Sequence, residues 1–292
     1  MKIQETPAKL VLGEDKAQYV RISEVLSRCE CLARENNLYF DPKVRDGIQA
    51  LRVINKEIAV AMAGKCAEDR VAKTFQYVMR SDANFFRNVY LSDGENETEL
   101  DAVVITKNGF LILEVKNAKE DITIAPDGRS LFNNSSCYHD ISIGEKMDRK
   151  RRLLRKRLER EFADRGIQKE IKIDSLLVFS TVRGVKIQVH DQFKKEKYCF
   201  RGSLINRIDS FESSVEYSEK EMAVINEIFQ QIETEQKRFT LTFQPEVLKR
   251  KIAEAFEILL NGSGVNQEKS IKKVNPFMRW IKKYSTSVAK AS

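Results

Sequence analysis

The segment T-E-L-D-A-V-V-I-T-K-N-G-F-L-I-L-E-V-K-N, Thr98–Asn117, decides the fold. Its two halves are rich in β-branched and other apolar residues, as strands are, and they flank the pair Asn108-Gly109. Asn-Gly between two such runs is among the strongest short-range signals for a β-hairpin. The segment therefore predicts two antiparallel strands joined by a tight turn.

The hairpin also predicts which side chains meet. If Asn108 and Gly109 form a two-residue turn, Asp101 faces Lys116 and Val103 faces Glu114 across the strands. Because side chains alternate along a strand, Asp101, Glu114 and Lys116 then share one face. The opposite face is apolar: Leu100, Ala102, Val104, Leu111, Leu113 and Val115. We therefore expect one face to be core and the other to gather two carboxylates and an ammonium group.

The sequence on both sides of the hairpin predicts helices and further strands. Apolar residues at three- and four-residue spacing predict one helix that ends at Asn36-Asn37 and a second that begins after Asp41-Pro42. Downstream we expect a basic helix over Gly144–Arg165, an apolar strand over Ser175–Thr181 and helices up to Leu260. Strands joined by a crossover helix favour a mixed α/β core.

Composition narrows the classes of protein. The 292 residues include 51 Lys and Arg against 43 Asp and Glu, a net charge of +8 that favours a polyanionic partner. The five cysteines are scattered and only two histidines are present, which excludes a disulfide framework and a closed zinc site. We find no signal peptide and no apolar run long enough for a membrane span, so we expect a cytoplasmic protein that does not bind membranes.

The polar face of the hairpin suggests metal chemistry. Two converging carboxylates suit a hard divalent cation such as Mg²⁺, and a nearby lysine suits an attacking water or a phosphate. The alternative is a structural ion pair between Asp101 and Lys116, with Glu114 at a solvated strand end. The residues alone leave both interpretations open.

The hairpin resembles the core of the nuclease-related domain (NERD) family of the PD-(D/E)XK nuclease superfamily. The metal site of that superfamily uses an Asp followed by E-x-K on the next strand, which correspond here to Asp101 and Glu114-Val115-Lys116. Upstream, G-K-C-A-E-D-R-V resembles the G-x-x-(G/A)-E helix motif of the family and implies that Glu68 is the helical acid of the site. The similarity covers roughly Ala63–Phe211.

The resemblance implies a fold and a ligand set. The fold is a mixed β-sheet core of PD-(D/E)XK type flanked by helices. Asp101, Glu114 and the Val115 carbonyl would bind Mg²⁺ or Mn²⁺, and Lys116 and Glu68 would complete the catalytic site. The domains expected are a helical N-terminal extension (1–62), the nuclease-related domain (63–211), C-terminal helices (212–261) and a basic tail (262–292).

Two local features differ from the family pattern. Leu100-Asp101-Ala102 stands where members often have I-D-H, and Lys146 stands about where an N-P-x-x-Q turn has its glutamine. The basic helix that follows is either a solvated face or a contact surface for phosphates, which position a nucleic acid without reading its sequence. Its candidate residues are Lys146, Arg149, Arg151, Arg152, Arg155 and Lys156.

These observations lead to one expected function and two alternatives. We expect a metal-dependent nuclease that hydrolyses phosphodiester bonds, with DNA as the first candidate substrate and RNA as the second. The alternatives are a catalytically inactive nucleic-acid-binding module and a protein-interaction module on the same fold. The N-terminal helices could mediate self-association or bind a partner protein. The basic tail is either solvated or a further contact for nucleic acid or a partner.

Overall fold

The computed structural model describes residues 23–117, 121–132, 142–180, 184–190, 193, 197–234 and 245–262. These residues fall into two compact units. The sheet unit contains the described residues from Ala63 to 234, and the helical unit contains residues 23–62 together with 245–262. Helix α2 (Pro42–Phe75) is continuous through the boundary between residues 62 and 63. The predicted basic tail lies, from residue 263 onward, outside the described residues.

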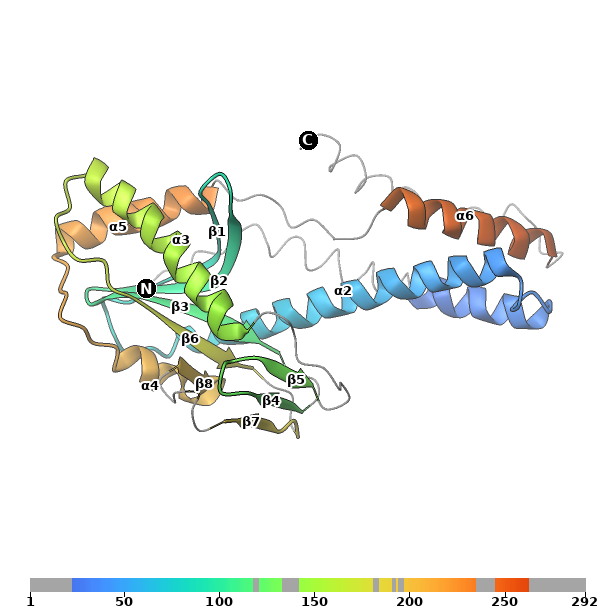
Figure 1. Ribbon diagram of the computed structural model, residues 1–292, viewed down its shortest axis with the longest axis horizontal. Helices are drawn as coiled ribbons and strands as arrows, with labels where there is room; N and C mark the ends of the chain where they lie inside the picture. The colour runs from blue at the N-terminus through green and yellow to red at the C-terminus, as the bar shows by residue number, and fades with distance from the viewer. Residues whose placement is uncertain are drawn as a thin grey trace. The chain divides into compact units, whose positions relative to one another are not determined.

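The helical unit packs three helical segments: residues 23–35, the first part of α2, and α6 (Pro245–Gly262) (Figure 1). The helix break predicted at Asn36-Asn37 is confirmed, and Asn37 has a φ of 56°. Gly47 lies directly against α6, because a Cβ atom there would be 2.2 Å from the Cβ of Ala255. The close approach of these two helices therefore requires glycine at position 47.

The sheet unit is built on a five-stranded sheet with the order β1-β2-β3-β6-β8. The strands are β1 (Asn84–Ser92), β2 (Glu97–Thr106), β3 (Gly109–Lys116), β6 (Ile173–Phe179) and β8 (Tyr198–Phe200). β1, β2 and β3 are antiparallel, whereas β3, β6 and β8 are parallel. A smaller sheet has the order β5-β4-β7 and consists of β4 (Ile122–Ile124), β5 (Ser130–Phe132) and β7 (Ile187–Val189). This arrangement confirms the predicted mixed α/β fold class.

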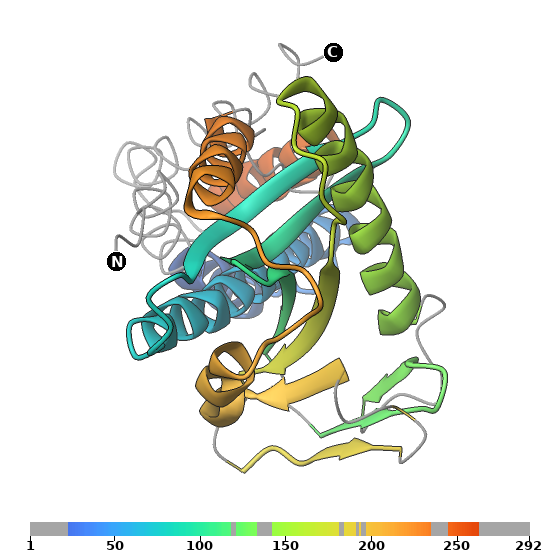
Figure 2. The ribbon, with the colours of Figure 1, turned by 90° about the vertical axis from the view of Figure 1, so that its left-hand side faces the viewer.

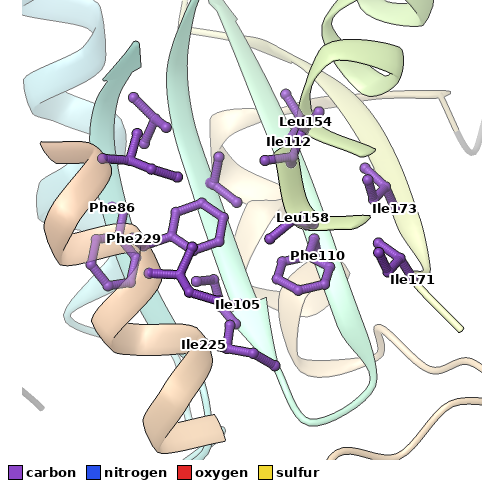
Figure 3. Close-up of a cluster of buried hydrophobic side chains, with 14 of the residues drawn as sticks. Phe86, Ile105, Phe110, Ile112, Leu154, Leu158, Ile171, Ile173, Ile225 and Phe229 are labelled. Carbon is purple, nitrogen blue, oxygen red and sulfur yellow. The ribbon is translucent and has the colours of Figure 1, made fainter. Parts of the chain in front are cut away.

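Helices cover both faces of the central sheet (Figure 2). On one face α3 (Ile143–Asp164) and α5 (Glu219–Thr234) bury a cluster around Phe110 and Phe229, whose rings stack 5.9 Å apart (Figure 3). On the other face the end of α2 and the short helix α4 (Leu204–Asp209), which follows the 3-10 turn η2 (Arg201–Ser203), bury a second apolar cluster. Both faces of the hairpin are therefore core over most of its length.

That finding corrects the expectation of one apolar and one polar face. Val103, Ile105, Phe110 and Ile112 lie on the same side of the sheet as Glu114 and are fully buried under α3 and α5. The polar residues occupy only the end of that face. The crossover helix α3 is the physical reason, since its apolar stripe needs a sheet surface to pack against.

The predicted register of the hairpin is also wrong by two residues. The observed pairs run from Thr106 with Gly109 to Ala102 with Leu113, so the turn is Lys107-Asn108 and the pairing ends one residue before Asp101 and Glu114. A type I′ turn with Asn108 and Gly109 at its centre needs a positive φ at both residues. Gly109 has a φ of 129°, but Asn108 does not have a positive φ. The two acids still come together, because Asp101 accepts the Val115 amide and lies, like Glu114, close to the Lys150 ammonium.

Contacts from distant parts of the chain explain this register. The Lys107 amide donates to Asp82 (2.9 Å), and the Asn108 side-chain amide donates to the Val215 carbonyl (3.2 Å). A Cβ atom on Gly109 would be 2.6 Å from the Lys172 carbonyl oxygen, which accepts the Phe110 amide. Glycine is therefore needed to start β3, not to form the turn.

The strands bend next to Asp101. The β1–β2 register contains no Asn88–Asp101 pair, and Asn88 has a left-handed φ of 50°. At this point the alternation shifts, because Leu100 and Val103, which are three residues apart, lie in the same apolar cluster. Asp101 therefore lies at a local irregularity of β2, close to where the β2–β3 pairing ends.

Candidate active site

Five charged side chains from four elements meet at this end of the sheet, and we call them the site cluster. They are Glu68 of α2, Asp101 of β2, Glu114 and Lys116 of β3, and Lys150 of α3. The end of β3 is tied down on both sides. The Asn117 side-chain amide donates to the Ala63 carbonyl of α2 (2.7 Å), and the Ser180 amide donates to the Lys116 carbonyl (2.9 Å).

Asp101 is held by the backbone of the neighbouring strand. Its Oδ2 accepts the Val115 amide at 2.6 Å, and its Oδ1 lies 4.0 Å from the Lys150 Nζ. Burial raises the pKa of Asp101 to about 6, and the negative charge of Glu114 adds to this effect. The position of Asp101 thus favours a cation nearby.

Glu114 is buried, with 4% of its surface exposed, and it contacts two ammonium groups. Its Oε1 lies 2.6 Å from the Lys116 Nζ, and its Oε2 accepts a hydrogen bond from the Lys150 Nζ. Burial alone would raise the pKa of Glu114, but the positive charges of these two lysines lower it below its usual value. Glu114 is therefore a carboxylate at neutral pH.

Glu68 completes the cluster from the helix side. Burial, and after it the negative charge of Asp101, raise the pKa of Glu68 to about 7. The neighbouring Asp69 instead forms an ion pair with Arg87, with 2.6 Å between the Arg87 Nη2 and the Asp69 Oδ1. A carboxyl with a pKa near neutrality exchanges its proton readily at physiological pH.

The pH dependence of stability tests whether the pKa of Glu68 is raised in the folded protein. A carboxyl whose pKa is higher in the folded protein than in the unfolded chain destabilises the fold as the pH rises between the two values. Glu68→Gln mimics the protonated acid, so it should leave the melting temperature of the metal-free protein nearly unchanged at pH 5 and raise it at pH 8. The gain is at most about 3.5 kcal/mol, since the pKa is raised from 4.5 to about 7 and each pKa unit corresponds to roughly 1.4 kcal/mol. Equal shifts in melting temperature at both pH values would contradict the assignment.

Lys150 is the residue of the cluster that the sequence analysis did not single out. The buried positions of α3 include Ile143, Met147, Leu154 and Leu158, and Lys150 falls in register with them at three- and four-residue spacing. Its side chain is only 12% exposed. The sequence signal for a buried lysine was its position within the apolar stripe of the helix. The neighbouring basic residues made this lysine hard to distinguish from the exposed ones.

The other basic residues of α3 point in different directions. Arg149 donates to Asn96 (3.2 Å) and Lys156 pairs with Asp93 (3.1 Å), so both contact the β1–β2 connection. Arg151 pairs with Asp148. Lys146 is exposed near the start of the helix.

Arg152 and Arg155 are exposed on a further side of α3. Together with Arg151 they line a shallow pocket of about 250 Å³ next to Ile173 of β6. Neither of them forms an ion pair among the described parts of the chain. Both are exposed to solvent and can contact an anion there, in a pocket that Asp148 also lines.

The sheet unit is a mixed α/β domain with a cluster of acids and lysines at the end of an antiparallel hairpin, consistent with a nuclease-type core. Residues 63–180 match the model of the nuclease-related domain family. This part of the chain is therefore similar to nuclease-related domains, in agreement with the resemblance seen in the hairpin. No significant match was found among curated proteins or solved structures. No helix in the described ranges is both long and apolar enough to cross a membrane.

Proposed function

We propose that this chain is a metal-dependent nuclease that hydrolyses phosphodiester bonds of DNA or RNA. The observation that supports this best is that one positive charge, the Lys150 ammonium, lies within reach of both Asp101 and Glu114. A metal ion at the position of this ammonium group would therefore lie close to both carboxylates. Lys116 lies beside it on Glu114.

The donor groups fit a small hard cation. Asp101 and Glu114 offer carboxylate oxygens, Val115 offers a backbone carbonyl, and Mg²⁺ needs few protein ligands because it keeps several waters. Within the described residues no group of three or more His, Cys, Asp and Glu side chains gathers closely enough to hold a metal ion. The proposed set therefore rests on two carboxylates and a carbonyl. A bound Mg²⁺ or Mn²⁺ lowers the pKa of a water ligand and neutralises charge on a phosphate.

Lys116 would act on the phosphate and the attacking water. Burial alone would lower the pKa of Lys116, but the carboxylate of Glu114 raises it above its usual value, so Lys116 stays an ammonium at neutral pH. It would donate hydrogen bonds to a phosphate oxygen and stabilise the charge that develops there. This state favours orientation of the water over removal of its proton by Lys116.

Glu68 would serve the water from the other side. Its pKa of about 7, raised by burial and by Asp101, allows it to accept a proton at neutral pH. It would complete the site through the water and not as a direct ligand, since the ligands proposed are Asp101, Glu114 and Val115.

The exposed arginines of α3 would bind the phosphate backbone. Replacing Arg152 and Arg155 with Glu should weaken binding to nucleic acids of all sequences and reduce the slope of log K against log salt by about two, because fewer counterions are released. The matched control is Arg70→Glu with Lys73→Glu, which makes the same charge change on exposed positions of α2. An unchanged slope in the Arg152/Arg155 variant would exclude this side of α3 as the contact surface.

One observation favours the alternative of an inactive binding module. Lys116 and Lys150 together engage both oxygens of Glu114, so the charge of this carboxylate is already compensated without a metal ion. In that case nucleic acid would bind without being cleaved.

A cleavage assay separates the two functions. The full chain is incubated with supercoiled plasmid, linear duplex and single-stranded substrates in Mg²⁺, in Mn²⁺ and in EDTA. Cleavage that depends on the metal supports the nuclease. Binding without cleavage in every condition would instead establish the inactive module.

A further inference from the structure

We propose that Lys150 is a built-in counter-ion that occupies the cation position of the site, so that a divalent metal must displace it to bind. This inference rests on the proposed function, because it assumes that Asp101 and Glu114 bind a metal ion. It gives Lys150 a role distinct from that of Lys116, which lies on the other oxygen of Glu114.

The geometry gives Lys150 this role. Its Nζ contacts Glu114 Oε2 and lies 4.0 Å from Asp101 Oδ1, and it is the cation of the cluster found near both carboxylates. Lys116, in contrast, lies at ion-pair distance from Glu114 but, among the described residues, not from Asp101. A metal ion shared by Asp101 and Glu114 and the ammonium of Lys150 would therefore compete for the same oxygens.

Burial makes this competition costly for the metal. The side chains of Lys150 and Glu114 are 12% and 6% exposed, and breaking a buried ion pair is far more costly than breaking a surface pair. Binding of the metal must first break this pair and move the Lys150 ammonium away. The like charges of the metal and the ammonium prevent both from using the same oxygens.

The position of Lys150 on α3 indicates how it is held. The helix begins with a capping box, in which the Glu145 amide donates to the Ser142 hydroxyl at 2.9 Å. Its buried residues Met147 and Leu154 flank Lys150 by about one turn on either side. The lysine backbone is thus fixed, and displacement of the ammonium requires only rotation of its side chain.

Metal binding without turnover tests the proposal. Isothermal titration of the full chain with Mn²⁺ should show that Lys150→Met binds Mn²⁺ at least tenfold more tightly than wild type, a gain of about 1.4 kcal/mol. Lys150→Arg keeps the positive charge and should gain nothing. Lys220→Met, the same change at an exposed position of α5, should match wild type.

The outcomes separate this proposal from the proposed function. If wild type binds Mn²⁺ and Lys150→Met binds it no more tightly, the counter-ion role is wrong while the metal site remains. If neither protein binds Mn²⁺, both the metal site and the counter-ion role are wrong. If Lys150→Met is unfolded in metal-free buffer, Lys150→Gln replaces it, since the amide still donates a hydrogen bond without charge. Failure of both variants to fold even with Mn²⁺ overturns the proposal, because the metal should then supply the missing positive charge.

Discussion

Replacing Glu114 with glutamine or alanine should abolish metal-dependent cleavage and reduce Mn²⁺ affinity, whereas nucleic-acid binding should be largely retained. Glu114 is the acid that joins the cation position to Lys116, and its side chain has almost no exposure. We expect the cleavage rate to fall by at least about 10³-fold, because the variant loses a ligand whose charge acts on the reacting phosphate. Cleavage rate and melting temperature should be measured together, each with and without Mn²⁺.

The pair of variants separates catalysis from stability. Glu114→Gln preserves shape and one acceptor oxygen, whereas Glu114→Ala leaves two buried ammonium groups without their carboxylate, which typically costs about 3–5 kcal/mol. If the cluster is only structural, both variants should lose stability while any activity persists in the folded fraction. Wild-type cleavage by folded Glu114→Gln would end the assignment of the active site to these residues.

Replacing Lys116 with methionine should reduce turnover by about 10²-fold or more while Mn²⁺ binds at least as tightly as in wild type. The ammonium of Lys116 does not coordinate metal, and its expected contribution is to the water and to the developing charge on the phosphate. Single-turnover cleavage and Mn²⁺ titration on the same preparation measure the two effects separately.

The control for Lys116→Met is Lys107→Met. Lys107 forms an exposed ion pair with Glu216 (2.8 Å), and such pairs contribute little to stability. This variant should cleave at the wild-type rate. A Lys116→Met protein that loses Mn²⁺ binding and turnover equally would show that Lys116 acts by positioning Glu114, not on the substrate.

Much of the fold was predictable because local patterns and the tertiary structure agree. The apolar run before Lys116 predicts a strand, and the strand Gly109–Lys116 is observed. The helix signal at Asp41-Pro42 is likewise confirmed, since the Asp41 carboxylate accepts the amides of Lys43 and Val44. In both places short-range chemistry alone specifies the structure.

The register of the hairpin was not predictable from Asn108-Gly109. Lys107 and Asn108 are held by partners far away in the chain, among them Asp82, Ser213 and Val215. Tertiary contacts, and not the local turn propensity of Asn108-Gly109, therefore determine the register. Asp101 and Glu114 converge nevertheless, because Asp101 is held by the Val115 amide next to Glu114 and both acids lie near Lys150.

The candidate site was predictable in its acids and in Lys116, but not in Lys150. E-x-K inside an apolar strand places two charges where burial is costly. This pattern indicates candidate functional residues without any knowledge of the fold. Lys150 acquires its role only when α3 crosses over the sheet and brings its stripe above β3. The roles assigned to these residues stay predictions until the variants are measured.

The packing of α5 determines how much of the chain can fold independently. The match to the nuclease-related domain ends at residue 180, yet the cluster around Phe110 is completed by Ile225 and Phe229 of α5 (Figure 3). A protein ending at residue 180 would expose the rings of Phe86 and Phe110, which contact Phe229, to water. The cost is about 1.5–3 kcal/mol for each large apolar side chain. The region that matches the family model is thus shorter than the region whose side chains complete the core of the sheet, which reaches Phe229 and Ile232 of α5.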